Sequence, residues 1–344
     1  MQLKNKCISA VAGSGKTRAI VDECYNNPNC KILLTTYTDN NADALKEKII
    51  EKFGTVPSRI TIRPWFSFLL ENWVRPYVVE FFTFPIGAHI GLHFVNERSM
   101  IYCKRGSKQY FFDDNNDIYS DKLSDFGAYC DEKTDKKCIK RLEEIYDIVC
   151  IDEIQDISGH DLDILTSLFK SSIRVLVVGD QQQRIFKTNP STYHQKQCEN
   201  IIEWIKTEFS SSVELCYMNY CYRCSFPICQ YVKELFSECQ ITSKNNNKSE
   251  HIGIFKIKKE ELDNYVQTFN PLILGFNKKS NHGFDKYMNY GESKGLEEDH
   301  VLIIPTKDIR NYITNGKEID SLSTKRKFYV AITRARYSVA FLID

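Results

Sequence analysis

The chain has 344 residues, of which 42% are hydrophobic and 12% aromatic, enough to fill the cores of two or three globular domains. Its formal net charge of +1 neither indicates nor excludes a nucleic-acid partner, because a local basic groove can exist within a balanced total. No run approaches the roughly eighteen apolar residues of a membrane span, and the N-terminus leads directly into a strand, so we expect a cytoplasmic protein without a membrane partner.

The first motif is a phosphate loop. The stretch from Ala10 to Thr17 fits the pattern G-x-x-x-x-G-K-[ST], with Ala in place of the first Gly, between a short apolar strand and a predicted helix over residues 16–25. Glycines there let backbone N–H groups approach a polyphosphate at a helix N-terminus. Lys16 is expected to reach the β- and γ-phosphates, and Thr17 to hold Mg²⁺. The predicted residues of this ATP site are Ala12, Gly13, Ser14, Gly15, Lys16, Thr17 and Arg18.

The next segments predict an α/β layout. Residues 31–36 form a short apolar strand and residues 39–52 an amphipathic helix, followed by another strand at 60–62. Residues 65–79 are dense in aromatics and predict a helix. Most of its rings are expected in a core, with base stacking as the less favoured alternative.

The second motif is an acidic pair at the end of a strand. An apolar strand over residues 148–151 runs into Asp152-Glu153-Ile154-Gln155-Asp156. We expect Asp152 to hold Mg²⁺ through water and Glu153 to orient and deprotonate the attacking water. The alternative is a solvated turn, but two carboxylates at a strand end in a chain that also has a phosphate loop argue against it.

A further strand and a second α/β block complete the predicted layout. Residues 175–178 are apolar and β-branched, and the strand leads to Gln183, whose amide can sense a γ-phosphate. The second block is expected to begin near Val213, with strands at 213–216, 272–276, 301–304 and 339–343 and a surface loop at 241–250. The predicted domains are 1–205, with an inserted subdomain at about 70–145 where the periodicity is lost, and 206–344.

The thirteen cysteines are spread through apolar segments, which is typical of reduced, buried thiols. Two groups could instead hold a metal: Cys221, Cys224 and Cys229 as zinc ligands, and a second set as ligands of an iron–sulfur cluster. The second set is Cys103, Cys130, Cys138 and Cys150. The first group lacks a convincing fourth ligand and the second includes a core-strand residue, so buried thiols are the favoured interpretation.

Taken in order, these motifs resemble those of the UvrD/Rep type of superfamily 1 helicases. Residues 12–17 resemble motif I, 36–38 motif Ia, 152–156 motif II, 179–183 motif III, 222–223 motif IV, 293–297 motif V, and 329–336, Tyr-Val-Ala-Ile-Thr-Arg-Ala-Arg, motif VI. The resemblance implies two RecA-like P-loop NTPase domains with parallel sheets, an inserted subdomain in the first, and ATP in the cleft between them.

The resemblance also assigns roles at the nucleotide. Arg223 and Arg334 would be arginine fingers from the second domain, with Arg334 expected on a helix. Tyr222 would stack on adenine and Glu297 would bond the ribose. The catalytic set implied in this way is Lys16, Glu153, Gln183, Arg223 and Arg334.

Other positions resemble those that bind the strand. Tyr37, Thr38 and Phe186 match positions at which the family contacts single-stranded nucleic acid, and ring stacking there needs no sequence readout. Gln183 would link the state of the γ-phosphate to these strand-binding loops.

Three departures from the family pattern stand out. Only nine residues precede Ala10, so the N-terminal glutamine motif that reads adenine has no place, which leaves the nucleotide preference open. Lys187, Thr188 and Asn189 follow Phe186, where the family has a Trp-Arg pair. The segment between Arg223 and Ser293 is also too short for the family's large second insertion, which predicts a weaker grip on DNA.

We therefore predict an ATP-dependent translocase or helicase on single-stranded DNA, moving 3′ to 5′, with a nuclease or other protein as a further possible partner. One alternative is an ATPase switch, for example a subunit of a repair or antiviral defence complex, that closes on nucleic acid or on a partner without unwinding. The other, a binding module with a decayed ATP site, is disfavoured because the key residues of the ATP motifs are intact.

Overall fold

The computed structural model describes residues 5–246, 248–276, 284 and 286–343, which form two compact units. The first unit runs to Ser9 and continues with Lys16–Gln181 and Lys187–Cys216. The second comprises Ala10–Gly15, Gln182–Phe186 and the chain from Tyr217 onward. The phosphate loop thus groups with the second unit although it lies near the start of the chain.

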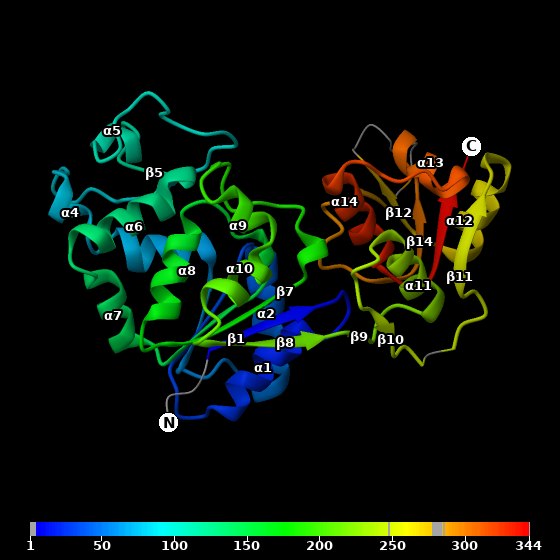
Figure 1. The fold of residues 1–344 in the computed structure, drawn as a ribbon, viewed down its shortest axis with the longest axis horizontal. Coiled ribbons are helices and arrows are strands. Elements are labelled where there is room, and N and C mark those ends of the chain that lie inside the picture. The colour runs from blue at the N-terminus through cyan, green and yellow to red at the C-terminus, as the bar shows by residue number, and fades with distance from the viewer. Residues whose placement is uncertain (1–4, 247, 277–283, 285, 344) are drawn as a thin grey trace. The chain divides into compact units, whose positions relative to one another are not determined.

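The first unit contains a six-stranded sheet in the order β3-β2-β6-β7-β1-β8, of which β7, β1 and β8 are labelled in Figure 1. Its strands are β1 (Asn5–Ala10), β2 (Ile32–Thr36), β3 (Ile60–Pro64), β6 (Ile148–Ile151), β7 (Arg174–Gly179) and β8 (Val213–Met218). The pairs from β3 through β1 are parallel, for example Cys150 opposite Leu34 on one side and Leu176 on the other. Continuous apolar strands of this kind are buried on both faces, so the central strands of this sheet need helices on each side.

Successive residues of these strands alternate between two cores. Ile148 and Cys150 pack with α1 (Lys16–Asn26) and α2 (Asp39–Phe53), whereas Val149 and Ile151 face the other core. That second core includes α8 (Asp161–Lys170) and α10 (Ile201–Glu208), and α9 (Gln195–Glu199) precedes α10. The sheet therefore carries helices on both faces, as the predicted RecA-like fold requires.

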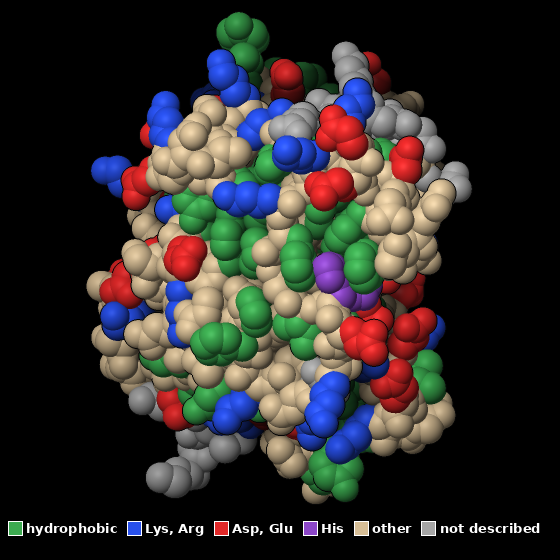
Figure 2. Space-filling view, turned by 90° about the vertical axis from the view of Figure 1, so that its right-hand side faces the viewer, with side chains coloured by type: hydrophobic (Ala, Val, Ile, Leu, Met, Phe, Trp, Pro, Cys, Tyr) green, Lys and Arg blue, Asp and Glu red, His purple; other side chains and the backbone are tan. Residues whose placement is uncertain are grey.

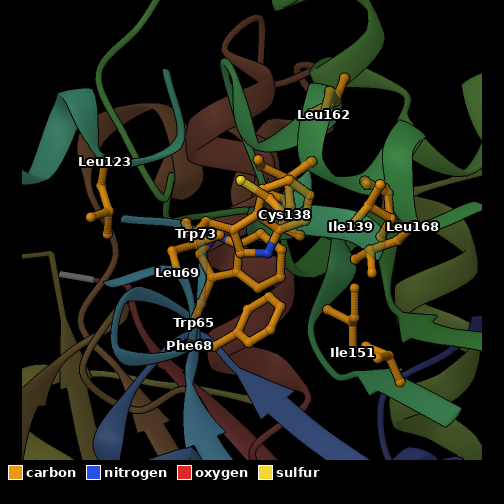
Figure 3. Close-up of a cluster of buried hydrophobic side chains, with 14 of the residues drawn as sticks. Trp65, Phe68, Leu69, Trp73, Leu123, Cys138, Ile139, Ile151, Leu162 and Leu168 are labelled. Atoms are coloured by element: carbon orange, nitrogen blue, oxygen red, sulfur yellow. The ribbon is translucent and has the colours of Figure 1, made fainter. Parts of the chain in front are cut away.

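An inserted region lies between β3 and β6 and confirms the predicted insertion in the first domain. Its elements are α3 (Trp65–Leu69), a π-helix (Leu70–Val74), α4 (Val78–Phe81), β4 (Leu92–His93), α5 (Lys108–Phe111), β5 (Ile118–Tyr119), α6 (Leu123–Lys133) and α7 (Lys137–Ile145). Figure 3 shows Trp65, Phe68 and Trp73 packed among aliphatic side chains of α6, α7 and α8. These rings belong to the core, as expected.

The helix predicted over residues 65–79 forms only in part: helical structure covers residues 65–74 and resumes at Val78. The chain widens into the π-helix at Leu70, where the Asn72 side chain donates to the Phe68 carbonyl at 3.0 Å, and α4 begins only at Val78. Four of the five π-helix residues are buried, so tertiary packing overrides the ordinary 3.6-residue spacing.

The second unit contains a five-stranded, fully parallel sheet in the order β11-β15-β14-β12-β13. Its strands are β11 (Gly253–Ile257), β12 (Leu272–Gly275), β13 (Tyr287–Asn289), β14 (Glu298–Ile303) and β15 (Ala335–Leu342), and its helices are α11 (Phe226–Leu235), α12 (Leu262–Phe269), α13 (Lys307–Asn315) and α14 (Leu322–Ile332). The fold class, two RecA-like P-loop domains with parallel sheets, is confirmed.

Two details of the second block differ from expectation. The strand predicted at 213–216 belongs to β8 of the first sheet, because Val213 and Leu215 pack into the core of the first unit. The predicted surface loop 241–250 contains β10 (Thr242–Ser243), which pairs with β9 (Tyr220–Cys221), and its residue 247 lies outside the described residues. The domain boundary between residues 205 and 206 stays a prediction.

One face of the second unit carries a cluster of stacked rings. Figure 2, which shows the side with α12 and β11, has hydrophobic side chains and histidine gathered in its middle. His251 stacks between Phe255, at 4.1 Å between ring centroids, and Phe269, at 3.9 Å. Burial lowers the pKa of His251, helped by the nearby His300.

No helix in the described ranges has the length and apolar character needed to cross a membrane.

Candidate nucleotide and strand-binding site

The phosphate loop contains two glycines whose backbone conformation favours glycine. Gly13 and Gly15 have φ of 67° and 89°, in the left-handed region that favours glycine. A Cβ on Gly13 would lie 2.6 Å from the Arg223 Cβ and 2.9 Å from the Cys221 Sγ, closer than real contacts allow. The loop backbone is therefore packed directly against the Tyr222–Arg223 segment.

Hydrogen bonds fix this loop within the second unit. The Ala12 N–H donates to the Tyr329 Oη at 3.2 Å, and the Tyr222 N–H donates to the Gly13 carbonyl at 2.9 Å. The Ser14 hydroxyl is buried and has no hydrogen-bond partner among the described residues. A buried hydroxyl without a partner is costly, and a phosphate oxygen is the kind of acceptor that would satisfy it.

Beside the loop lies a hollow of about 370 Å³ lined by Gly13, Gly15, Tyr222, Arg223, Glu297 and Arg336. Arg223 Nε donates to one oxygen of the Glu297 carboxylate and Arg336 Nη2 to the other, both at 2.8 Å. Burial opposes ionisation of Glu297, but the hydrogen bonds and charges of the two arginines outweigh it and lower the pKa of that carboxyl. Two cations and a glycine loop thus face one hollow, which suits a polyphosphate.

Arg334 does not lie on a helix, so that expectation is wrong. Helix α14 ends at Ile332, Thr333 caps it, and β15 begins at Ala335, which leaves Arg334 in the turn between them. Its side chain is buried and donates to the carbonyls of Val330 at 2.9 Å and Leu296 at 3.0 Å, and to the Thr333 hydroxyl at 3.2 Å. Its role as an arginine finger stays a prediction.

The residues predicted to hold Mg²⁺ lie in the first unit. Thr17 is in the first turn of α1, and Asp152 directly follows β6, where its Oδ1 accepts from the Glu153 N–H at 2.8 Å. A hydroxyl and a carboxylate are hard oxygen donors, and Mg²⁺ takes one or two protein ligands together with phosphates and water. The donor pair therefore fits a magnesium ion that binds together with the nucleotide. Arg18 is exposed on α1 beside Asp22, at 3.7 Å.

Most of the cysteine thiols are buried, which is the interpretation that the sequence favours. None of the thirteen cysteines forms a disulfide, and the buried ones include Cys221, Cys224 and Cys229. In the part of the chain that the structure describes, no three His, Cys, Asp or Glu side chains are grouped so as to hold a metal ion.

The second motif has an unusual backbone. Glu153 has φ of 55°, a conformation that bulky residues seldom adopt and that is often found at functional sites. The side chain of Gln155 donates to the Glu153 carboxylate. Asp152 and Glu153 line a small cavity of about 10 Å³ that Tyr37 also borders, so the structure brings these three predicted residues together.

The predicted strand-binding residues differ in exposure. The Tyr37 ring is half-buried, with its edge toward Phe66 at 5.9 Å between centroids, and Thr38 caps α2 by accepting from the Asn41 N–H at 3.2 Å. Phe186 is 38% exposed, and the Lys294 Nζ lies 5.7 Å from the centre of its ring. Phe186 is therefore a partly exposed ring with a cation over it. Gln183 is buried in a 3-10 turn.

The departure after Phe186 has a structural explanation. Thr188 and Asn189 are both buried, and each hydrogen bonds to Ser158 at the entry to α8. The Thr188 hydroxyl also donates to Asp161. These residues anchor the loop to the first unit and are not available to stack on a strand.

Sequence reasoning missed three residues of this region. Arg336 lines the hollow, Tyr329 bonds the loop, and Gln155 contacts Glu153. All three lie inside motifs named from the sequence. Arg336 is the last residue of motif VI, two positions after the predicted finger Arg334, a signal that could have indicated it.

A parallel sheet whose first strand enters a glycine-rich loop, with an acidic pair at the end of another strand, defines a P-loop NTPase. Two family models support a narrower assignment: an AAA domain matches residues 1–189, and the viral superfamily 1 RNA helicase core domain matches residues 112–343. Each covers more than half of the chain, which therefore belongs to the superfamily 1 helicases.

The chain is also similar to solved viral helicases. The PRRSV helicase shares 14% identity at a TM-score of 0.49, and the arterivirus nonstructural protein 10 helicase in complex with DNA shares 12% at 0.49. Each comparison covers 98% of this chain but only 52% and 60% of the other. The chain thus spans little more than half the length of these helicases. No curated protein sequence matches it.

Proposed function

We propose that the chain is an ATP-dependent translocase or helicase that hydrolyses ATP with Mg²⁺ when it binds single-stranded nucleic acid. The observation that carries this proposal is the hollow in which the phosphate loop meets Tyr222, Arg223 and Arg336. Its glycine backbone and two guanidinium groups suit a triphosphate, and the 60% exposed Tyr222 offers a ring face for a base.

The residues around the nucleotide would divide the chemistry. Lys16 offsets charge on the β- and γ-phosphates, while Thr17 and Asp152 hold Mg²⁺, which would polarise the phosphates when bound. Glu153 accepts the proton of the attacking water. Arg223 exchanges its ion pair with Glu297 for the phosphate, which frees one oxygen of that carboxylate for the ribose. Gln183 and Arg334 complete the catalytic set.

The strand would be held by ring stacking and by phosphate contacts. Tyr37 and Phe186 supply rings, and Lys294 beside Phe186 supplies a cation, a combination that binds single strands without sequence readout. We propose DNA as the strand and 3′ to 5′ movement, on the resemblance to UvrD/Rep enzymes. The matching family is described as RNA helicases, so RNA is tested in parallel.

The proposal is tested by steady-state ATP hydrolysis without nucleic acid, with oligo-dT, and with oligo-U of the same length. We expect several-fold stimulation by DNA that declines with salt, because backbone contacts release counterions. Lys16→Ala is the matched control and should abolish hydrolysis under all three conditions. No hydrolysis, or a rate that neither strand changes, would overturn the proposal.

An ATPase switch without unwinding is the second candidate. Between Arg223 and Ser293 the described residues form α11, α12 and short strands, without a further subdomain there to grip a duplex. Two assays separate the candidates. One measures unwinding of a partial duplex with a 3′ single-stranded tail, and the other measures displacement of streptavidin that blocks a single-stranded tail. Strand-stimulated hydrolysis without unwinding or streptavidin displacement would favour the switch.

A further inference from the structure

Gln155 connects the ends of two neighbouring strands of the first sheet. It is fully buried in the turn after β6, where its Nε2 donates to the Glu153 carboxylate. Its Oε1 accepts from the Asp180 N–H, the first residue after β7, at 3.0 Å. One amide group therefore joins the expected catalytic base to the backbone of the next strand end.

The space for this amide exists because residue 179 is glycine. A Cβ on Gly179 would lie 2.4 Å from the Gln155 Oε1 and 2.7 Å from the Ile154 Cγ2. The φ of Gly179 is not in the left-handed region, so the need for glycine here is steric and not conformational. Glycine at the end of β7 is thus part of the same arrangement.

The chemistry of the surroundings favours a neutral donor at this position. Asp152 and Asp156 flank Glu153 and Gln155 in the turn, and Asp180 follows β7, so the carboxylate of Glu153 lies in an acidic stretch. The Gln155 amide can donate to that carboxylate and accept from a backbone N–H at the same time without adding charge. A carboxylate in its place would accept from the backbone but could donate only when protonated.

We propose that Gln155 is a positioning residue that holds Glu153 in its catalytic orientation and makes that orientation depend on the chain after β7. This inference rests on the proposed function. From Asp180 the chain continues directly through Gln183 to Phe186. A shift of this segment on strand binding therefore moves the Asp180 N–H, and Gln155 transmits the shift to the base.

The test compares Gln155→Ala with Gln240→Ala, an exposed glutamine in the second unit, in the full chain. Single-turnover hydrolysis should fall roughly 10- to 100-fold with Gln155→Ala, by analogy with the loss of an outer-shell partner of a metal ligand. Binding of a fluorescent ATP analogue should change less than about twofold, and stimulation by oligo-dT should be lost, as expected for an effect on the base and not on the nucleotide site. Gly179→Ala should reproduce this pattern by displacing the amide.

The isosteric variant Gln155→Glu gives a readout that a merely structural role would not move. The glutamate keeps the size of the side chain and the oxygen that accepts from the Asp180 N–H, but it has no amide N–H to donate to the Glu153 carboxylate. Single-turnover hydrolysis should therefore fall as in Gln155→Ala while binding of the ATP analogue stays within about twofold of wild type, whereas Gln240→Glu should match wild type in both.

Two outcomes would overturn the inference while wild-type hydrolysis stands. One is a Gln155→Ala rate and strand stimulation equal to wild type, and the other is a Gln155→Glu single-turnover rate equal to wild type. A wild-type protein that does not hydrolyse ATP at all would instead overturn the proposed function.

Discussion

At the scale of single residues, the arginines of the second unit are held in place by protein groups. Arg223 and Arg336 share Glu297, and Arg334 is buried among carbonyl groups. A guanidinium whose N–H groups already donate to protein oxygens moves to a phosphate only if its hydrogen bonds to the phosphate are stronger than those it loses. Arginine contacts in this family are therefore expected to matter in the transition state more than in binding.

Removal of the buried arginine tests this directly. Arg334→Ala should lower the single-turnover hydrolysis rate by a factor on the order of 10³ while ATP binding changes much less, because a finger acts on charge that develops in the transition state. Arg334→Lys keeps the charge and serves as the control, with partial recovery expected. A normal rate for bound ATP would remove Arg334 from the catalytic set.

The base is tested separately. Glu153→Gln keeps the size of the side chain but cannot accept the proton of water, so the variant should bind ATP and retain it unhydrolysed. Nitrocellulose retention of labelled ATP with and without a chase measures this. Hydrolysis at the wild-type rate would show that Glu153 is not the base.

At the scale of elements, the phosphate loop depends on its close approach to the chain around Arg223. Gly13→Ala should abolish binding of a fluorescent ATP analogue, because the methyl group would meet Arg223 and Cys221. Gly54→Ala is the matched control, since Gly54 also has positive φ, 78°, but nothing lies within 4 Å of its Cβ position. We expect that control to cost about 1 kcal/mol of stability and no affinity. Equal binding by both variants would contradict the steric argument.

The elements also show what sequence patterns can and cannot predict. The β-branched run at 175–178 and the amphipathic run at 39–52 are local signals, and both elements form as predicted. The edge strand β8 and the π-helix at Leu70 depend on contacts with residues distant in the chain, which periodicity does not encode. The order of the motifs indicated the phosphate loop and the acidic pair after β6. It did not indicate the hydrogen bonds of the Gln155 amide or the two arginines that share Glu297, because side-chain hydrogen bonds depend on how the chain packs.

At the scale of the whole molecule, acid stability should depend on a histidine–aspartate cluster in the first unit. Asp163 contacts His160 Nδ1 at 2.8 Å and His194 Nε2 at 3.0 Å. Burial opposes ionisation of Asp163, but these histidines outweigh it and lower its pKa to about 2. A lowered carboxyl pKa stabilises the fold above the unfolded value near 4 and loses this contribution as pH falls toward 2.

Denaturant unfolding at pH 4 and pH 2 measures this contribution. Wild type should lose about 1 to 2 kcal/mol more than Asp163→Asn over this range, a figure reduced for the partial exposure of the side chain. Asp114→Asn, an exposed carboxyl, should behave as wild type. Equal losses in wild type and Asp163→Asn would exclude the cluster as the source.

The bond between the Ala12 N–H and the Tyr329 hydroxyl joins groups 317 residues apart. A ribosome makes Ala12 317 residues before it makes Tyr329. While those residues are being made, a nascent chain carries the phosphate-loop sequence without the hydroxyl that fixes the loop. Nucleotide binding in the arrangement described here therefore requires that Tyr329 has left the exit tunnel.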